Sequence, residues 1–202
     1  MTEYAIRPLE TATWDAFAAL CEKHNGVWGG CWCTWFHPAC AEKGTPNWTR
    51  NYKERLVREG RAHAGLVFDG DAAVGWCEFG PPEELPNIHH RRQYETGLVS
   101  PPDYRLTCIF VDRDYRRRGV AGLALAGALD FIAAAGGGVV EGYPHDTQGQ
   151  RKSASFLYNG TRSLYERAGF EYERPKGQGN CVMRKVVAPA PVTRSRRRSG
   201  SR

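Results

Sequence analysis

Residues 111–125 read Val-Asp-Arg-Asp-Tyr-Arg-Arg-Arg-Gly-Val-Ala-Gly-Leu-Ala-Leu, and this stretch decides the fold. It continues an apolar run, 106–111, that is typical of a buried strand, and it opens an alanine-rich segment, 119–135, that predicts a helix. In the turn between them, the pattern Arg116-x-x-Gly119-x-Ala121 puts small residues at a helix N-terminus. Backbone N–H groups are free there and the peptide dipoles add up to partial positive charge. The sequence therefore predicts a cradle for a pyrophosphate.

The cradle differs from two common nucleotide-binding loops. No Gly-Lys-Ser/Thr follows it, as in the phosphate loop of ATPases, and no G-x-G-x-x-G is present. It resembles the acetyl-CoA signature of the GNAT acyltransferase superfamily, (Gln/Arg)-x-x-Gly-x-(Gly/Ala). Ser163-Leu-Tyr-Glu-Arg-Ala-Gly-Phe170 is similar to the next motif of that family, a short helix that ends at a glycine and runs into a strand. The resemblance spans residues 3–187 and is firmest over 105–186.

Apolar periodicity and turn residues place the remaining elements. We expect strands at 3–8, 64–68, 73–79, 106–111, 139–143, 170–174 and 181–186, and helices after Thr13, after Asn47, at 119–135 and at 161–168. In the second helix, Trp48, Tyr52 and Leu56 share one face, and Arg50, Lys53 and Arg58 are predicted to point outward. Residues 81–104 contain five prolines and are expected to be a loop or an insertion.

The resemblance implies a mixed α/β fold. Its central twisted sheet has about seven strands flanked by four helices, and strands 4 and 5, here 106–111 and 139–143, splay apart at one end. The pantetheine arm of acetyl-CoA lies in that gap. The resemblance assigns cofactor contacts to the strand backbone, the arginines and small residues of the cradle, and the start of the short helix: Phe110, Val111, Arg116, Arg117, Arg118, Gly119, Val120, Ala121 and Thr161. The family often has an Asn where this chain has Tyr158, so Thr161 and Ser163 are the expected substitutes.

Acetyl transfer to an amine needs a neutral amine, a stabilised oxyanion and a proton for the leaving thiolate. The resemblance makes Tyr165 the acid. The base is open, because the strand 106–111 has no carboxylate. Glu141 and Glu78 each lie in an apolar strand, where burial would raise the pKa. We rank Glu141 slightly ahead, and outward-facing side chains or a water chain with no dedicated base are the alternatives.

The segment Gly30–Cys40 is rich in cysteine and tryptophan. Cys31, Cys33, His37 and Cys40 could be zinc ligands, but C-x-C is a strained chelate for one tetrahedral ion, so we expect no metal. We favour a wall of the acceptor pocket in which Trp32, Trp35 and Phe36 offer flat apolar and cation–π surface. Plain core packing of these aromatic residues is the competing interpretation.

Composition limits the remaining possibilities. The chain has 202 residues, of which 41% are hydrophobic, enough for one domain with a full core. Five of its 28 Lys and Arg residues lie in the last nine positions, so the other 23 nearly balance the 22 Asp and Glu residues. We therefore expect an acyltransferase domain at 1–187 and a disordered basic tail at 188–202 that binds nucleic acid weakly at most. Seven cysteines and no signal-like N-terminus favour reduced thiols in a cytoplasm, with no membrane partner.

The sequence thus predicts an enzyme that uses acetyl-CoA to acetylate a primary amine, on a small molecule or a protein lysine, by direct transfer. A module of the same shape that binds CoA without turnover, or that acts on nucleic acid through its tail, is the alternative. The identity of the amine, the acyl chain and a homodimeric state are left open.

Overall fold

A computed structural model describes residues 3–39, 48–146 and 157–191. The elements follow one another as β1 (Ala5–Pro8), η1 (Thr11–Thr13), α1 (Trp14–Lys23), α2 (Trp48–Arg58), β2 (His63–Asp69), β3 (Ala72–Gly80), α3 (Arg91–Thr96), β4 (Tyr104–Val111), η2 (Arg113–Tyr115), α4 (Val120–Ala134), β5 (Gly138–Gly142), α5 (Arg162–Arg167), β6 (Glu171–Lys176) and β7 (Asn180–Val187). The predicted mixed α/β fold is confirmed.

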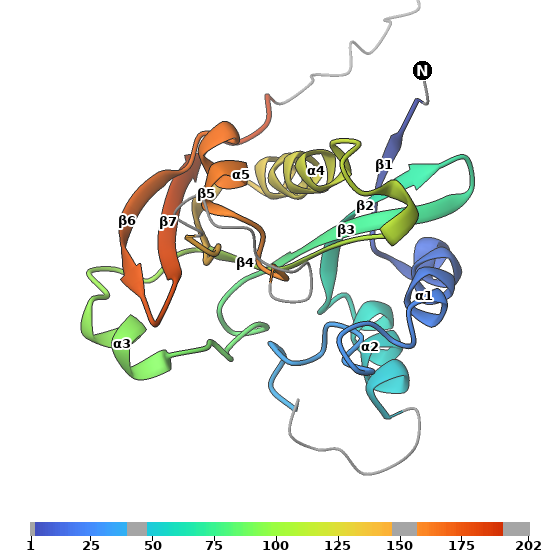
Figure 1. Ribbon diagram of the computed structural model, residues 1–202, viewed down its shortest axis with the longest axis horizontal. Coiled ribbons are helices and arrows are strands. Elements are labelled where there is room, and N and C mark those ends of the chain that lie inside the picture. Colours follow the sequence, from blue (N-terminus) through green and yellow to red (C-terminus); the bar gives the residue numbers. More distant parts are fainter. Residues whose placement is uncertain (1–2, 40–47, 147–156, 192–202) are drawn as a thin grey trace, which may run out of the picture.

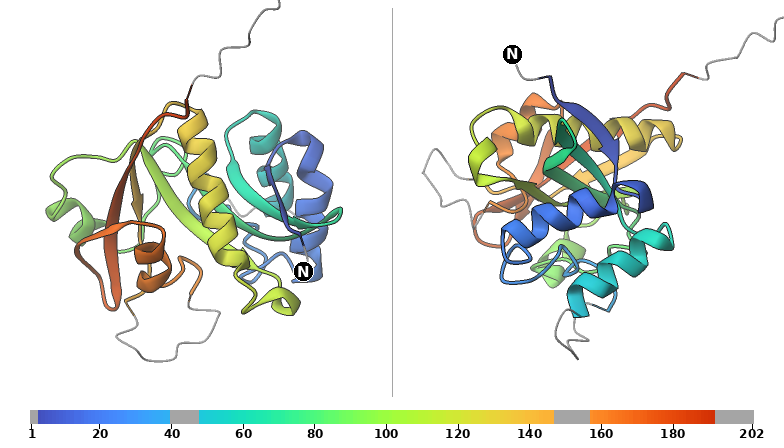
Figure 2. Two further views of the ribbon diagram at one scale, coloured as in Figure 1. Left: turned by 90° about the horizontal axis from the view of Figure 1, so that it is seen from above. Right: turned by 90° about the vertical axis from the view of Figure 1, so that its right-hand side faces the viewer.

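One seven-stranded sheet, in the order β1-β2-β3-β4-β5-β7-β6, forms the centre of the molecule. In Figure 1, α4 and α5 lie above this sheet and α1 and α2 lie below it, and the turned views in Figure 2 agree. Each face has its own hydrophobic core. Trp76, Cys108 and Phe110 belong to the core under α1 and α2, whereas Cys77 and Ile109 belong to the core under α4 and α5. This separation follows from the alternation of side chains along a strand.

Strands β4 and β5 form the parallel pair that the family resemblance implies, and they pair only briefly. Tyr104, Arg105 and Leu106 are opposite Val140, Glu141 and Gly142. β5 ends at Gly142, whereas β4 continues to Val111. The second half of β4 therefore has β3 on one side and, among the described residues, no strand on the other, which opens the sheet at its middle.

Several local expectations need correction. The segment 81–104 contains a short helix, α3, and so it is more than a loop. Thr13 does stand before α1, but its hydroxyl bonds the Pro8 and Glu10 carbonyls and does not cap the helix. The prediction that Lys53 points outward is wrong, because this side chain is buried (1% exposed). Asn47, expected to cap α2, lies outside the described residues.

Across the described ranges, no helix combines the length and the apolar character needed to cross a bilayer.

The start of the expected C-terminal tail contacts the domain. The Ala190 amide donates to the Ala133 carbonyl at the end of α4 (2.8 Å). The first residues of the expected tail therefore lie against the domain.

Candidate functional site

The turn before α4 has the backbone geometry of an anion cradle. Gly119 stands before the first residue of α4 with φ 80° and ψ −3°, and Arg117 also has a positive φ of 61°. Left-handed residues that alternate with ordinary ones turn successive N–H groups toward one concavity. The first N–H groups of α4 have no partner within the helix, so they add to it. The pyrophosphate cradle predicted from the sequence is present as a shape.

Two adjoining hollows of about 460 and 330 Å³ open in front of this turn. We call them together the cradle cavity, and both are lined by Val111, Arg116, Arg117, Ala121, Leu164 and Arg167. Gly119 and Val120 line the smaller hollow, and Phe110 and Thr161 line the larger one. Arg118 is different, because its guanidinium lies over the Tyr115 ring, 5.2 Å from the ring centroid. Two of the three predicted arginines therefore line the cavity.

The open edge of β4 faces this cavity, and strand alternation decides which amides it offers. The Asp112 amide donates to Val74 of β3, so Phe110, two residues earlier, also turns its backbone toward β3. Ile109 and Val111 face the open edge, and the Ile109 amide donates to the Tyr158 carbonyl there (2.6 Å). Of the two predicted backbone contacts, Val111 lies on the accessible edge, whereas Phe110 turns its backbone toward β3.

Helix α5 supplies the other rim of the opening. Thr161 caps it, with Oγ1 accepting from the Leu164 amide (3.3 Å) and 3.1 Å from Ser163 Oγ. Tyr165 is fully buried against Phe170, and its ring lies beside Gly142, where a Cβ would come 2.0 Å from Cε1. Its hydroxyl is buried without a hydrogen-bond partner among the described residues. Burial raises the pKa of Tyr165 well above its usual value, so the phenol keeps its proton at neutral pH.

A second cavity, of about 420 Å³, lies on the α1 and α2 face of the sheet. We call it the aromatic cavity, and it is lined by Trp28, Gly29, Gly30, Cys31, Cys33, Thr34, Trp35, Phe36, Thr49, His89, Cys108 and Tyr158. Trp35 and His89 stack with 3.7 Å between ring centroids and 12° between planes. Trp28 lines this cavity and the larger hollow of the cradle cavity as well. Trp28 is therefore a wall residue of both cavities.

The wall between α1 and α2 has an unusual backbone. Val27, Trp28, Trp32 and Cys33 all have φ near +50°, a region that side-chain-bearing residues rarely adopt. The strain is concentrated where the wall of the aromatic cavity forms. Trp35 and Phe36 line that cavity, whereas Trp32 does not. It stacks on Trp14 with 6.2 Å between ring centroids and is 7% exposed, so its position corresponds to the core-packing alternative.

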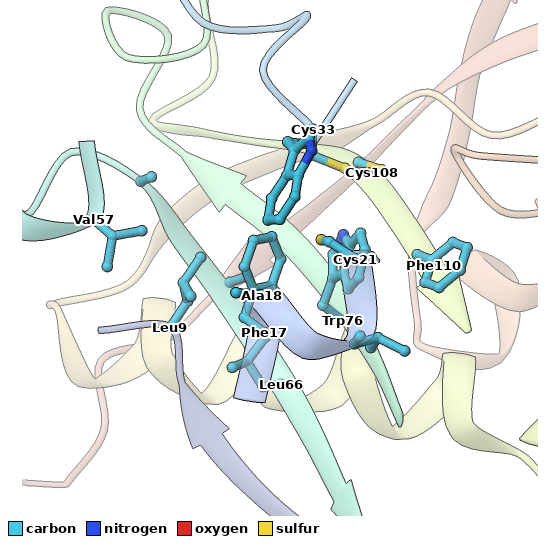
Figure 3. Packing of buried hydrophobic residues seen from close by; sticks show 14 of the residues in the cluster. Leu9, Phe17, Ala18, Cys21, Cys33, Val57, Leu66, Trp76, Cys108 and Phe110 are labelled. Atoms are coloured by element: carbon cyan, nitrogen blue, oxygen red, sulfur yellow. Dashed lines mark hydrogen bonds between the residues drawn. The ribbon is translucent and has the colours of Figure 1, made fainter. Parts of the chain in front are cut away.

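Two thiols form part of the inner wall of the aromatic cavity, and a buried ion pair lies beyond them. Cys33 and Cys108 point at each other with 2.6 Å between sulfur atoms, and Figure 3 shows them above Phe17 and Trp76. Glu78, one of the two candidate bases, accepts from Lys53 Nζ (2.5 Å) and from the Thr107 hydroxyl (2.7 Å). Burial alone would raise the pKa of Glu78, but the nearby Lys53 ammonium outweighs this effect, and the pKa is lowered to about 2. Glu78 is therefore ionised and already paired with the Lys53 ammonium.

His37 completes this group. Its Nδ1 lies 3.0 Å from the Glu84 carbonyl, which only an N–H can approach, so Nε2 carries the lone pair. Lys53 Nζ lies 3.2 Å from that Nε2. Burial and the nearby ammonium lower the pKa of His37, which keeps the ring neutral. Both ring nitrogens of this proposed zinc ligand are therefore engaged, and Cys40 lies outside the described residues. Within the described ranges, no three His, Cys, Asp or Glu side chains are placed to share a metal ion.

Glu141, the other candidate base, belongs to a separate cluster. Its Oε2 accepts from the hydroxyls of Tyr94 (2.7 Å) and Tyr143 (2.9 Å), and its Oε1 lies 3.1 Å from Arg184 Nε. The side chain is fully buried and lines neither the cradle cavity nor the aromatic cavity. Neither of the two predicted carboxylates therefore lines the cradle cavity or the aromatic cavity.

The structure thus has a cradle at a helix N-terminus beside a parallel strand pair that opens at one end. A comparison of the sequence with protein families agrees with this architecture. The profile of the acetyltransferase (GNAT) family matches residues 31–170, more than half of the chain. The chain belongs to the GNAT acetyltransferase family.

Solved structures give the same fold at low identity. A GNAT-family protein from Desulfovibrio desulfuricans is 20% identical with a TM-score of 0.51, over 92% of this chain and all of its own. A GNAT family N-acetyltransferase from Escherichia coli, solved in complex with CoA, is 16% identical with a TM-score of 0.50, over 93% of this chain and 83% of its own. No curated protein matches the chain. At these identities the likeness extends to the fold.

Sequence reasoning missed three residues around this GNAT site. Arg167 lines the cradle cavity, and its position one helical turn after Leu164 was the available signal. Lys53 was placed outside, although Val57, four residues on, continues the buried stripe of α2. His89 lies in the segment 81–104 that we expected to be a loop or an insertion, and nothing in its local sequence indicates that it stacks on Trp35.

Proposed function

We propose that this GNAT protein transfers the acetyl group of acetyl-CoA directly to a primary amine. The observation that carries the proposal is that Trp28 is a wall residue of both cavities. One cavity has the cradle, the arginines and the open edge of β4, and the other has aromatic walls. A nucleotide thioester entering from the first cavity would bring its reactive end to the second. An amine bound in the second would face the thioester without any covalent link to the protein.

The chain's own groups fit the parts of acetyl-CoA. The N–H groups before and within the first turn of α4 suit the pyrophosphate, and Arg116, Arg117 and Arg167 suit its negative charge. The backbone of Val111 is available to the pantetheine amides. The Ile109 amide is held by the Tyr158 carbonyl, so a ligand that uses it must displace this bond.

Three chemical tasks remain: to protonate the leaving thiolate, to stabilise the oxyanion and to remove a proton from the amine. Tyr165 lines none of these cavities, but its ring lies beside Gly142, where β5 ends, and we assign to its phenol, which is protonated because burial raises its pKa, the donation of a proton to the leaving thiolate. Trp28 has a buried indole N–H without a partner among the described residues, at the junction where the thioester oxygen would become negative. Glu78 and Glu141 are both held by other side chains. Proton removal from the amine is therefore assigned to water, with no dedicated carboxylate.

We assign this chemistry to residues 1–187 and treat 188–202 as a basic tail outside it. Thiol release from acetyl-CoA, measured with a panel of primary amines, tests the activity. Arg116→Ala should weaken CoA binding in calorimetry by about 10-fold or more, the scale of a charge-assisted contact. Arg118→Ala, whose side chain lies on Tyr115, is the matched control and should change it little. Tight CoA binding without transfer to any amine would contradict the proposal.

A further inference from the structure

The walls of the aromatic cavity are flat rings. Trp35 and His89 stack in parallel, and Phe36 meets Trp35 at 82° with 4.9 Å between centroids. Tyr158 meets His89 at 63° with 5.7 Å between centroids. Ring faces and edges attract other rings through dispersion and complementary quadrupoles, beyond the area that they bury. The cavity therefore offers its best contacts to a planar ligand.

Among the described residues, no side chain that lines this cavity is charged at neutral pH. Burial, with a smaller effect from Lys176, lowers the pKa of His89 to about 4, so its imidazole is neutral at pH 7. Burial raises the pKa of Cys31 and of Tyr158, which keeps the thiol and the phenol protonated. The carboxylate beneath the cavity, Glu78, is engaged by Lys53 and Thr107. A cationic ligand would lose its hydration to walls that offer no opposite formal charge, and the attraction of the ring faces would offset only part of that cost.

We infer that the acceptor of this enzyme is an aromatic amine, with its amino group attached directly to a planar ring of one or two fused cycles. The inference rests on the proposed transfer function. An amino group on a ring is uncharged at neutral pH, so it can attack without a carboxylate to deprotonate it. A cavity of about 420 Å³ has room for such a ring system.

The transfer balances without a further reactant. The amine nitrogen forms a bond to the acetyl carbonyl carbon, and the bond from that carbon to the CoA sulfur breaks. One amine proton ends on the sulfur, which leaves as a thiol. The products are the N-aryl acetamide and CoA.

A panel of amines of similar size tests the planar ring and the charge of the nitrogen separately. Aniline and 6-aminoquinoline are planar and neutral, benzylamine has the ring but is charged, and cyclohexylamine and spermidine are charged and non-planar. At pH 7.5 we expect kcat/KM for aniline or 6-aminoquinoline to exceed that for cyclohexylamine and spermidine by about 10-fold or more, because a ring and a neutral nitrogen both contribute. An equal or larger kcat/KM for cyclohexylamine or spermidine would leave the transferase function standing and overturn the aromatic class.

A pair of histidine variants tests the wall itself. His89→Ala removes the ring stacked on Trp35, and it should raise the KM for 6-aminoquinoline by about 3- to 10-fold, the scale of one ring–ring contact, without changing the KM for acetyl-CoA. His63→Ala is the control, because His63 also stacks on a ring, Phe79, but lines a different cavity. A KM that rises equally in both variants, or in neither, would overturn the assignment.

A binding measurement separates this inference from the function on which it rests. Acetanilide, the product expected from aniline, should bind to the wild-type protein in the presence of CoA in ligand-observed NMR. His89→Ala should weaken that binding, and His63→Ala should not. If no amine is acetylated but acetanilide binds in this pattern, the transfer function fails and the ring preference stands. Absence of acetanilide binding, with CoA bound, would overturn the ring preference.

Discussion

Lys53 is a buried ammonium with an acceptor for each of its three hydrogens. They are Glu78 Oε1 at 2.5 Å, His37 Nε2 at 3.2 Å and the Cys33 carbonyl at 3.5 Å. Burial favours the neutral amine, but the carboxylate outweighs that effect and raises the pKa of Lys53. This cluster joins α2, the cysteine-rich wall and β3. It fixes the wall of the aromatic cavity to the sheet, so its contribution to the site is positional.

Removal of the Lys53 ammonium should show how much an unpaired Glu78 carboxylate destabilises the fold. Lys53→Met leaves the Glu78 carboxylate buried without its cation, and we expect a loss of about 3–5 kcal/mol in the free energy of unfolding, measured with urea. The double variant Lys53→Met/Glu78→Gln should recover part of that loss, because no unpaired charge remains. Arg58→Met on the same helix is the control. It breaks an exposed pair with Glu54 and should cost about 1 kcal/mol or less. Equal losses in the two single variants would contradict the buried network.

Glu78 should also give the fold an acid limit. Its pKa is about 2 in the folded protein and 4.5 in the reference state, so its stabilising effect is complete above pH 4.5 and is lost as pH falls toward 2. The free energy of unfolding of the wild type should therefore drop on the order of 2 kcal/mol more over that window than that of Glu78→Gln. Unfolding curves at pH 7, 5, 4 and 3 measure this. Glu22→Gln, at an exposed site, should follow the wild type, and parallel pH dependence in Glu78→Gln would count against the shifted pKa.

Tyr165 combines a protonated hydroxyl with no partner among the described residues. Tyr165→Phe removes an unsatisfied buried group, so the free energy of unfolding should stay the same or rise slightly. If thiolate protonation limits the rate, kcat should fall by about 10²-fold or more with little change in the KM for acetyl-CoA. Steady-state kinetics together with urea unfolding check both parts. Full kcat in Tyr165→Phe, with chemistry shown to be rate-limiting, would remove this residue from the mechanism.

At the scale of single elements, two glycines near the start of α4 should respond in opposite ways to substitution by alanine. Gly119 has φ 80°, whereas Gly122 lies inside the first turns of α4 at an ordinary helical φ. A Cβ at either position would meet no atom within 4 Å, so the effects of substitution come from the backbone. Gly119→Ala should cost about 1 kcal/mol in unfolding free energy, and Gly122→Ala should add up to about 1 kcal/mol.

The same turn lines the cradle cavity, so ligand binding gives a second measurement. Gly119→Val adds a branched side chain beside the N–H groups assigned to the pyrophosphate, and its calorimetric affinity for acetyl-CoA should fall substantially. Gly122→Ala keeps those groups clear and should retain the affinity. Unchanged affinity in Gly119→Val would remove the pyrophosphate from this turn.

The elements also show what a sequence can and cannot predict. The cradle and the α5 motif are short local patterns, so the fold followed from them. The residues of β4 whose backbone faces the open edge could not be predicted, because Ile109, Phe110 and Val111 are all apolar. Only the backbone hydrogen bonds of Ile109 and Asp112 show which residues turn toward β3 and which toward the open edge. Glu78 was recognised as buried in a strand, but its partner Lys53 lies 25 residues away on a helix whose stripe is wider than expected. Pairings of this kind depend on the tertiary fold, which local periodicity does not specify.

At the scale of the whole molecule, the sheet separates two approaches to one junction. The cradle cavity includes α4 and α5, the aromatic cavity lies on the α1 and α2 face, and Trp28 belongs to both. Each cavity has its own volume, so one ligand need not leave before the other binds. Under the proposed function, we therefore expect a ternary complex and direct acetyl transfer.

Initial-velocity kinetics measure that order of events. With both substrates varied, reciprocal plots should intersect, and CoA should compete with acetyl-CoA but not with the amine. The alternative is a thioester on Cys108, the buried thiol of β4 that lines the aromatic cavity. It predicts parallel plots and an increase in protein mass by one acetyl group when acetyl-CoA is supplied alone. Cys108→Ala should keep intersecting plots and substantial kcat, because a thiol enclosed among Cys33 and other core residues acts as a small hydrophobic group. Parallel plots in the wild type, together with loss of turnover in Cys108→Ala, would replace direct transfer with a covalent route.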